Sequence, residues 1–378
     1  MVALLFPGQG SQHAGMLASW LELPASEPTL VHWSGLAGID LLAAGTTWTD
    51  NEIRDTAVAQ PLLTAAALLS ARALLGEERP DVVCGHSVGE LPALAVAGVL
   101  TDDEAITLAA LRGRAMAAAA GVAATGMAAV LGGDTDLVLA LAERLGLEVA
   151  TVNVAGQVVL GGSTQSLDEL AAHPPTGARV RRLDVAGAFH TTAMRPAVTA
   201  FTAAVADLTP GTPRVAVVAN RDGAVVTEGR HALDRLVAQL TTAVRFDRCL
   251  ERIAALGVRS AVEVAPAGTL TALAKRALPE AELAALRGPQ DLDHARTLLH
   301  VAGEHTPVDW QALPATESGV VDPLVAAGQA VDAGTAVAVV SGRGGATTIV
   351  APRSGTVTEW LVSAGDPVRT GQLLAVLG

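Results

Sequence analysis

Gly85-His86-Ser87-Val88-Gly89 lies between a short apolar run at residues 82–84 and a stretch at residues 90–95 that can begin a helix. A serine flanked by glycines at a strand-to-helix turn is the pattern of a nucleophile elbow, which exposes the serine hydroxyl. Only glycine leaves the flanking backbone enough room to pack so tightly. The first N–H groups of the following helix, and its dipole, would face an oxyanion formed beside Ser87. The stretch therefore predicts a strand–turn–helix unit in which Ser87 is the nucleophile.

Near the amino terminus stands a second motif, Leu4-Leu5-Phe6-Pro7-Gly8-Gln9-Gly10-Ser11-Gln12, with the pattern of an apolar strand that ends in a glycine-rich turn. Together with Ser87 and its neighbours, this motif resembles the malonyl-CoA:acyl carrier protein transacylases. Further segments agree with that family in order and spacing, namely LRGRAM at 111–116, GAFHT at 187–191, Gln239-Leu240 with AVRF at 243–246, and VAPAGTL at 264–270. The resemblance covers roughly residues 1–300.

The resemblance implies a transferase that uses a coenzyme A thioester. It would move a malonyl group from malonyl-CoA, through a Ser87 acyl-enzyme, to the phosphopantetheine thiol of an acyl carrier protein in fatty acid or polyketide synthesis. A transacylase subunit of a malonate decarboxylase, and a polyketide-type acyltransferase with another acyl-CoA, remain alternatives within the same enzyme class. From other classes there remain a scaffold role for the carboxy-terminal part and an α/β-hydrolase esterase. The Gly8-Gln9-Gly10 turn and Arg112 disfavour the esterase.

The same resemblance implies the catalytic groups. His190 would act as the base that a serine hydroxyl needs to become a nucleophile, and no acidic residue stands at a family position to orient it. The backbone carbonyl of Gln239 would instead hold the other imidazole nitrogen, so we expect a change of the Gln239 side chain to be mild. The backbone N–H groups of Gln9 and Val88 would form the oxyanion hole.

The substrate pocket is also implied by family positions. A planar guanidinium can bind a carboxylate through two parallel hydrogen bonds, and Arg112 stands at the position for the malonyl carboxylate. Phe189 narrows the pocket in the way of malonyl-selective members. We expect His86 to have a structural role on the other side of the elbow. Further family positions that line or brace the pocket are Met127, Asn153 and Gln157.

The formal charge of −13, from 38 acidic and 25 basic residues, argues against nucleic acid as a partner. Coenzyme A and acyl carrier proteins are also acidic, so local arginine clusters must offset the general repulsion. The densest cluster is ARVRR at residues 178–182. Alternation along a strand would place Arg179 and Arg181 on one face, where they could dock the carrier protein. An ordinary solvated edge strand is the alternative.

Other features of the composition exclude several classes of site. No uninterrupted apolar run of about 18 residues indicates a membrane span, and the amino terminus has no targeting pattern. We therefore expect a cytoplasmic protein without a membrane partner. The two cysteines, Cys84 and Cys249, fit neither a disulfide framework nor a zinc site, so we expect both in the core and no metal.

The order of strand-like and helical stretches predicts the domain organisation. Up to about residue 118 they alternate as in an α/β domain. A β-α-β-β-α-β order then predicts an inserted ferredoxin-like subdomain at about residues 122–187, where the family also has one. We therefore expect an acyltransferase domain at residues 1–305, with an α/β-hydrolase-like core of parallel strands. A linker would follow at residues 306–314.

Residues 315–378 contain an internal repeat with an offset of 37 residues, VAAG at 325–328 and VSAG at 362–365. These half-motifs resemble biotinyl/lipoyl carrier domains, which are flattened all-β barrels of two sheets. At the position of the lysine that carries the prosthetic group in that family, this chain has Gly344, and no lysine follows Lys275. We therefore expect an unmodified relative of a carrier domain, with neither biotin nor lipoate as a cofactor.

Overall fold

The computed structural model describes residues 1–303, 311–342, 345–360, 362–368 and 373–378. They belong to two compact units, Met1–His305 and Thr306–Gly378. Gly344 and most of the predicted linker, residues 306–310, lie outside the described residues. Residues 311–314, which we expected in the linker, form strand β12 (Gln311–Pro314) because they pair with β19 (Leu373–Leu377).

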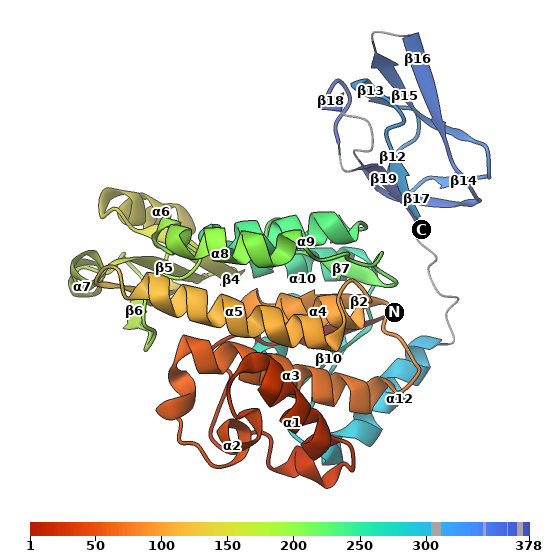
Figure 1. Ribbon diagram of the computed structural model, residues 1–378. Helices are drawn as coiled ribbons and strands as arrows, with labels where there is room; N and C mark the ends of the chain where they lie inside the picture. Colours follow the sequence, from red (N-terminus) through yellow and green to blue (C-terminus); the bar gives the residue numbers. More distant parts are fainter. Residues whose placement is uncertain (304–310, 343–344, 361, 369–372) are drawn as a thin grey trace. The chain divides into compact units, whose positions relative to one another are not determined.

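A six-stranded sheet forms the centre of the first unit (Figure 1). The register pairs Phe6 with Gly85, so the turns after the first two strands meet at one edge of the sheet. Four of the five parallel strands are buried along their whole length, as parallel strands covered on both faces should be. In sheet order the strands are β11 (Glu282–Ala285), β10 (Ser260–Glu263), β1 (Val2–Phe6), β2 (Val82–Gly85), β7 (Ala216–Val218) and β8 (Val225–Val226). Neighbouring strands run parallel, except that β7 and β8 are antiparallel.

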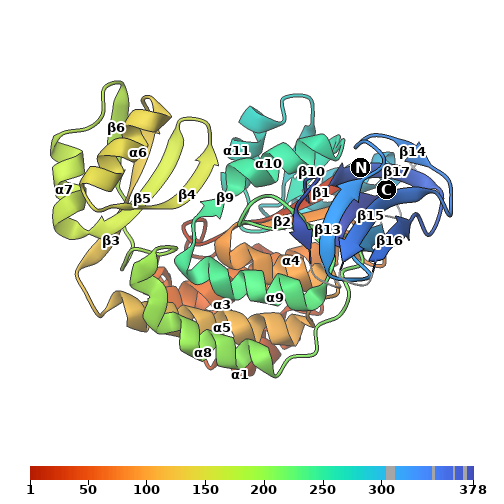
Figure 2. The same ribbon diagram turned by 90° about the horizontal axis from the view of Figure 1, so that it is seen from above.

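Helices pack on both sides of this sheet (Figure 2). The helix α3 is apolar and long enough to cross a membrane. Its most apolar stretch of 18 residues is 83% buried, so α3 is a core helix of the first unit. It packs against α5, which begins at a capping box between Thr101 and Glu104. The helices are α1 (Ser26–Ala37), α2 (Leu41–Thr46), α3 (Thr56–Leu75), α4 (Glu90–Val96), α5 (Asp102–Ala120), α8 (Arg195–Ala206), α9 (Gly229–Ala238), α10 (Phe246–Ala255), α11 (Thr269–Ala277) and α12 (Leu292–Gly303).

A smaller five-stranded sheet, in the order β6-β3-β5-β4-β9, forms a subdomain of the first unit (Figure 2). Its apolar face towards α6 and α7 has its own core, which includes Val130 and Leu167. Met127 and Ala129 belong to the large core instead. The sheet extends beyond the predicted boundary because β9 pairs in parallel with β4. The elements are β3 (Thr125–Gly132), α6 (Thr135–Arg144), β4 (Glu148–Val154), β5 (Gln157–Ser163), α7 (Thr164–Ala172), β6 (Ala178–Arg182) and β9 (Val244–Arg245).

The second unit consists of two four-stranded sheets, in the orders β12-β19-β17-β14 and β16-β15-β13-β18. They enclose an apolar core that includes Val321, Val337 and Val357. Gly328 and Gly365 occupy equivalent turns of the repeat with φ of 84° and 87°, a left-handed conformation that favours glycine. The remaining strands are β13 (Gly319–Pro323), β14 (Ala330–Val331), β15 (Ala336–Gly342), β16 (Gly345–Val350), β17 (Gly355–Trp360) and β18 (Pro367–Val368).

Candidate active site

The strand-to-helix turn after β2 has the strained backbone of a nucleophile elbow. Ser87 has a φ of 55°, which is uncommon for a residue with a side chain. A Cβ atom on Gly85 would collide with the backbone of Gly89, and one on Gly89 would collide with the carbonyl oxygen of Phe6. Both glycines are therefore required for the turn to close against β1. The sequence pattern and the local geometry agree here.

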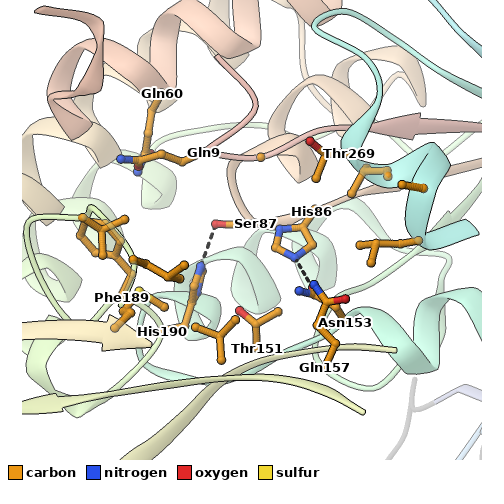
Figure 3. Close-up of a pocket in the computed structure, with 18 of the residues that line it drawn as sticks. Gln9, Gln60, His86, Ser87, Thr151, Asn153, Gln157, Phe189, His190 and Thr269 are labelled. Atoms are coloured by element: carbon orange, nitrogen blue, oxygen red, sulfur yellow. Dashed lines mark hydrogen bonds between the residues drawn. The ribbon is translucent and has the colours of Figure 1, made fainter. Parts of the chain in front are cut away.

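Ser87 and His190 form a hydrogen-bonded pair across the cavity (Figure 3). Ser87 Oγ lies 2.7 Å from His190 Nε2, and His190 Nδ1 lies 2.8 Å from the backbone oxygen of Gln239. A carbonyl oxygen can only accept, so Nδ1 carries the proton and Nε2 is free to accept from the serine hydroxyl. Burial, assisted by the charge of Arg112, lowers the pKa of His190 to about 3. The imidazole is thus neutral at neutral pH and can take a proton.

His190 is itself held in an uncommon backbone conformation, with a φ of 60°. No local sequence pattern indicates this second strained residue. Its neighbour Phe189 lies in the cavity wall, and Thr191 is buried. Strain of this kind persists where surrounding structure fixes it and is concentrated at functional sites. The two residues that share the short hydrogen bond, Ser87 and His190, are the only described residues other than glycine with positive φ.

Arg112 lies fully buried on α5 beside this pair. Its Nη1 donates to Gln60 Oε1 at 2.9 Å and its Nη2 donates to Gln239 Oε1 at 2.7 Å. A longer contact of 3.4 Å joins Nη2 to Ser87 Oγ. Burial lowers the pKa of Arg112 to about 10, against the opposing effect of Glu90. The guanidinium therefore keeps its charge at neutral pH, next to the serine oxygen.

The expectation that the Gln239 side chain matters little is not supported by its contacts. Besides the bond from Arg112, its amide nitrogen donates to Glu90 Oε2 at 2.6 Å and to Asn220 Oδ1 at 3.0 Å. The backbone oxygen of the same residue holds His190. Gln239 therefore holds His190 with its backbone and Arg112 with its side chain.

Sequence reasoning did not identify Gln60, Glu90 or Asn220. Asn220 Oδ1 accepts from the backbone N–H of Ser87 at 2.8 Å, and its Nδ2 donates to the Gly85 oxygen at 2.6 Å. The sequence pattern contains one indication of Asn220, because this polar residue follows the buried strand β7 at the carboxyl edge of the sheet. Glu90 likewise stands as a lone charge at the start of the apolar helix α4.

A cavity of about 500 Å³ opens at this site. His86, expected on the other side of the elbow, lies in its wall instead, with Nε2 3.0 Å from Asn153 Oδ1 (Figure 3). Its ring is directed towards the small sheet, because Asn153 lies on β4. Burial lowers the pKa of His86. Among the residues that line the cavity are Gln9, Gln60, Met127, Thr151, Asn153, Gln157, Phe189, Thr269 and Arg276.

The two backbone groups expected to bind an oxyanion belong to the two turns that meet at the sheet edge. Gln9 lies in the cavity wall between Gly8 and Gly10, and Val88 follows Ser87 in the elbow. A Cβ atom on Gly8 would collide with the backbone oxygen of His86, so glycine allows the two turns to approach closely.

Arg179 and Arg181 lie exposed on β6, an edge strand of the small sheet. The register pairs Arg181 with Ala129 and Arg179 with Leu131. Because alternate residues share a face, both arginines lie on the face of Met127, which lines the cavity. Arg182 points to the other face, where it binds Asp168 of α7 at 2.8 Å.

Comparison with known proteins places this site in a family. Residues 3–306 match the family model described as acyl transferase domain, and residues 313–377 match the one described as biotin-requiring enzyme. The malonyl CoA-acyl carrier protein transacylase of Mycobacterium tuberculosis is 48% identical over 302 residues, which are 79% of this chain and 100% of that protein. This chain belongs to the malonyl CoA-acyl carrier protein transacylase family.

Solved structures of transacylases have the same fold as the first unit. The crystal structure of the Mycobacterium tuberculosis transacylase superposes with a TM-score of 0.76 at 48% identity, covering 78% of this chain and 99% of that one. A malonyl-transacylase in complex with its type II PKS acyl-carrier protein superposes with a TM-score of 0.73 at 30% identity, covering 78% and 99%. The second unit lies outside the matched length of the transacylases.

Proposed function

We propose that the protein transfers a malonyl group from malonyl-CoA to the phosphopantetheine thiol of an acyl carrier protein. His190 Nε2 takes the proton of Ser87 as Oγ attacks the thioester carbonyl carbon. The resulting oxyanion is held by the backbone N–H groups of Gln9 and Val88. Collapse of the intermediate breaks the carbon–sulfur bond, and the histidine returns the proton to the leaving thiolate. The carrier thiol then repeats these steps in reverse on the acyl-serine.

Substrate choice rests on Arg112 in this proposal. A malonyl group on Ser87 Oγ carries a free carboxylate, and the guanidinium lies 3.4 Å from that oxygen before substrate binds. A charged donor in a buried site pairs strongly with a carboxylate because little water competes for it. Phe189, Met127 and Asn153 line the same cavity and would limit the size of the acyl group.

The observation that carries the proposal is the buried arginine beside the Ser87–His190 pair. An esterase for neutral acyl groups has no use for a buried cation at its nucleophile, because burying an unpaired charge is costly. The names of the relatives also favour a transacylase that serves an acyl carrier protein over a malonate decarboxylase subunit.

We propose that Arg179 and Arg181 dock the acidic carrier protein. Support comes from their exposure and from their position on the cavity side of the small sheet, where a carrier must deliver its thiol. Charge complementarity of this kind raises the rate of encounter more than the final affinity.

We also propose finer assignments for the fold. The order β6-β3-β5-β4, with α6 and α7 against one face, supports a ferredoxin-like subdomain, and the elbow after β2 of a parallel sheet supports an α/β-hydrolase-like core. The second unit, with its two sheets, would be an unmodified biotinyl/lipoyl-like barrel. We place the enzyme in the cytoplasm as a soluble protein, since the long apolar helix α3 is largely buried in the first unit.

The test is a direct assay of both half-reactions. The protein is mixed with malonyl-CoA, acetyl-CoA or methylmalonyl-CoA, and the intact mass is measured before and after addition of a holo acyl carrier protein. We expect a malonyl adduct that moves to the carrier, with far less adduct from acetyl-CoA. An adduct that is lost to water and is never transferred to the carrier would identify a hydrolase and contradict the proposal.

A further inference from the structure

A buried glutamate contacts two residues, Asn220 and Gln239, that are themselves hydrogen-bonded to Ser87 and His190. Glu90, the first residue of α4, is 7% exposed. Its Oε1 accepts from the backbone N–H of Asn220 at 2.7 Å, and its Oε2 accepts from the amide nitrogen of Gln239 at 2.6 Å. Neither hydrogen bond takes part in the reaction steps proposed above, so those steps do not explain why a carboxylate is buried at this position.

The hydrogen bonds of Glu90 determine which way the Gln239 carboxamide faces. An ionised carboxylate can only accept, so the nitrogen of the amide must point towards it and the oxygen must point away. That oxygen accepts from Arg112 Nη2 at 2.7 Å. The oxygen of Asn220, which also accepts from the Gln239 nitrogen, is fixed in turn by the N–H of Ser87. Backbone groups of the elbow thus anchor the whole chain of donors and acceptors.

We propose that Glu90 is a positioning residue, which through Gln239 holds the Arg112 guanidinium towards Ser87 Oγ and so sets the preference for acyl groups with a free carboxylate. The inference rests on the proposed role of Arg112 and goes beyond it. Without this orientation the amide nitrogen would face the guanidinium, two sets of donors would oppose each other, and Arg112 would turn away from the serine.

Replacing the carboxylate by an amide reverses the arrangement. In Glu90→Gln the side-chain oxygen must still accept from the N–H of Asn220, because a backbone N–H can only donate. The new NH2 group then faces the NH2 group of Gln239, which can offer its oxygen instead only by flipping its carboxamide and giving up its bond to Asn220 Oδ1. Its nitrogen would then oppose Arg112. The substitution keeps the volume of the side chain, so it opens no cavity; it changes the direction of one hydrogen bond and removes the negative charge that faces Arg112.

Protonation of Glu90 has the same consequence as this substitution. Burial raises its pKa to about 7, and the bond from Asn220 and the charges of Arg112 on α5 and Arg235 on α9 oppose the rise, while Asp222 adds to it. Below this pH the carboxyl group carries a proton on the oxygen that faces Gln239. The preference for malonyl over acetyl groups should therefore fall as the pH drops through about 7. His190, with its pKa of about 3, keeps its charge state in this range.

The experiment measures the rates at which malonyl-CoA and acetyl-CoA acylate Ser87 in the full chain, on both sides of pH 7. We expect the malonyl-to-acetyl ratio of Glu90→Gln to be about tenfold below that of the parent at alkaline pH, the effect of one misdirected charged hydrogen bond. The ratio of the parent should decline towards acid, whereas that of Glu90→Gln should not depend on pH.

Glu263→Gln is the matched control, because Glu263 is also fully buried and accepts from the backbone N–H groups of Leu270 and Thr271. It should lower the melting temperature without changing the pH dependence of the ratio. An unchanged ratio in Glu90→Gln, with a reduced one in Arg112→Ala, would overturn the positioning role alone. An unchanged ratio in Arg112→Ala would instead contradict the proposed function of Arg112. If Glu90→Gln does not fold, the parent still decides when its ratio is followed over the whole pH range in which it stays folded, since a ratio that nowhere declines towards acid overturns the inference.

Discussion

The two units of the chain differ in what they bury. In the first unit, charged and polar side chains lie in the interior around the catalytic pair, among them Glu90, Arg112, Asn220 and Gln239. In the second unit, the buried residues among those that the structure describes are all apolar. Burying polar groups costs free energy unless each finds partners. The comparison indicates that the first unit keeps these buried polar groups, despite their cost in free energy, because the site is built from them. The second unit has an apolar core alone.

Removing the Ser87 hydroxyl from the polar interior of the first unit should reduce activity more than any other change. Ser87→Ala should abolish covalent acylation, since no acceptor hydroxyl remains next to His190 Nε2. Mass spectrometry after mixing with malonyl-CoA should show an adduct on the parent only. Ser166→Ala in α7 is the control and should acylate like the parent. A malonyl adduct that persists in Ser87→Ala would mean that the buried polar cluster serves a different nucleophile.

Removing the buried cation should have the next largest effect. Arg112→Ala should reduce malonyl transfer by about thirty- to a hundredfold more than acetyl transfer, as loss of a charge-assisted pair of about 2–3 kcal/mol implies. Arg114→Ala is a matched control on the same helix, because Arg114 donates to the Ala37 oxygen away from the cavity. Equal losses with both acyl groups in Arg112→Ala would show that the arginine supports the fold rather than the substrate.

The same contrast explains which parts could be predicted from the sequence. The elbow at Ser87 follows from glycines next to the serine, so a local pattern was sufficient. The position of Arg112 was implied by family resemblance, and the structure places it beside the serine oxygen. The internal repeat predicts two equivalent halves in the second unit, and in the structure Gly328 and Gly365 occupy equivalent turns.

What the sequence could not reveal are partnerships between distant residues. Glu90 and Gln239 meet although 149 positions separate them, and no local pattern indicates such a bond. The family resemblance assigns Gln239 a role only through its backbone carbonyl, and it says nothing of the hydrogen bonds that the side chain makes. Residues 311–314 resemble a linker in sequence, and their pairing with β19 joins segments too far apart in the chain for a local pattern to show it.

Reversing the exposed charges of β6 should have a smaller effect than changing the buried ones. Arg179→Glu/Arg181→Glu should raise the apparent Michaelis constant for the carrier protein about three- to tenfold at low salt, since exposed charges contribute little each. Self-acylation by malonyl-CoA should stay the same. Arg144→Glu/Arg182→Glu changes the charge equally, but Arg182 points to the helix-covered face, so this control should have little effect. Equal carrier kinetics in both double variants would leave β6 as an ordinary solvated edge.

Deleting the second unit should have the smallest effect, because Ser87, Arg112 and His190 and their hydrogen-bond partners all belong to the first unit. The Mycobacterium tuberculosis relative matches the first unit over its whole length, so a transacylase of this family exists without the second unit. A chain ending at residue 305 should acylate at the rate of the full chain, within about twofold, the range expected for changes far from a site. The full chain, expressed with an active biotin ligase, should give a blank streptavidin blot, since Gly344 offers no amine. A large loss of acylation on deletion would show that the two units depend on each other. A biotin or lipoyl mass increment on the full chain would contradict the assignment of an unmodified barrel.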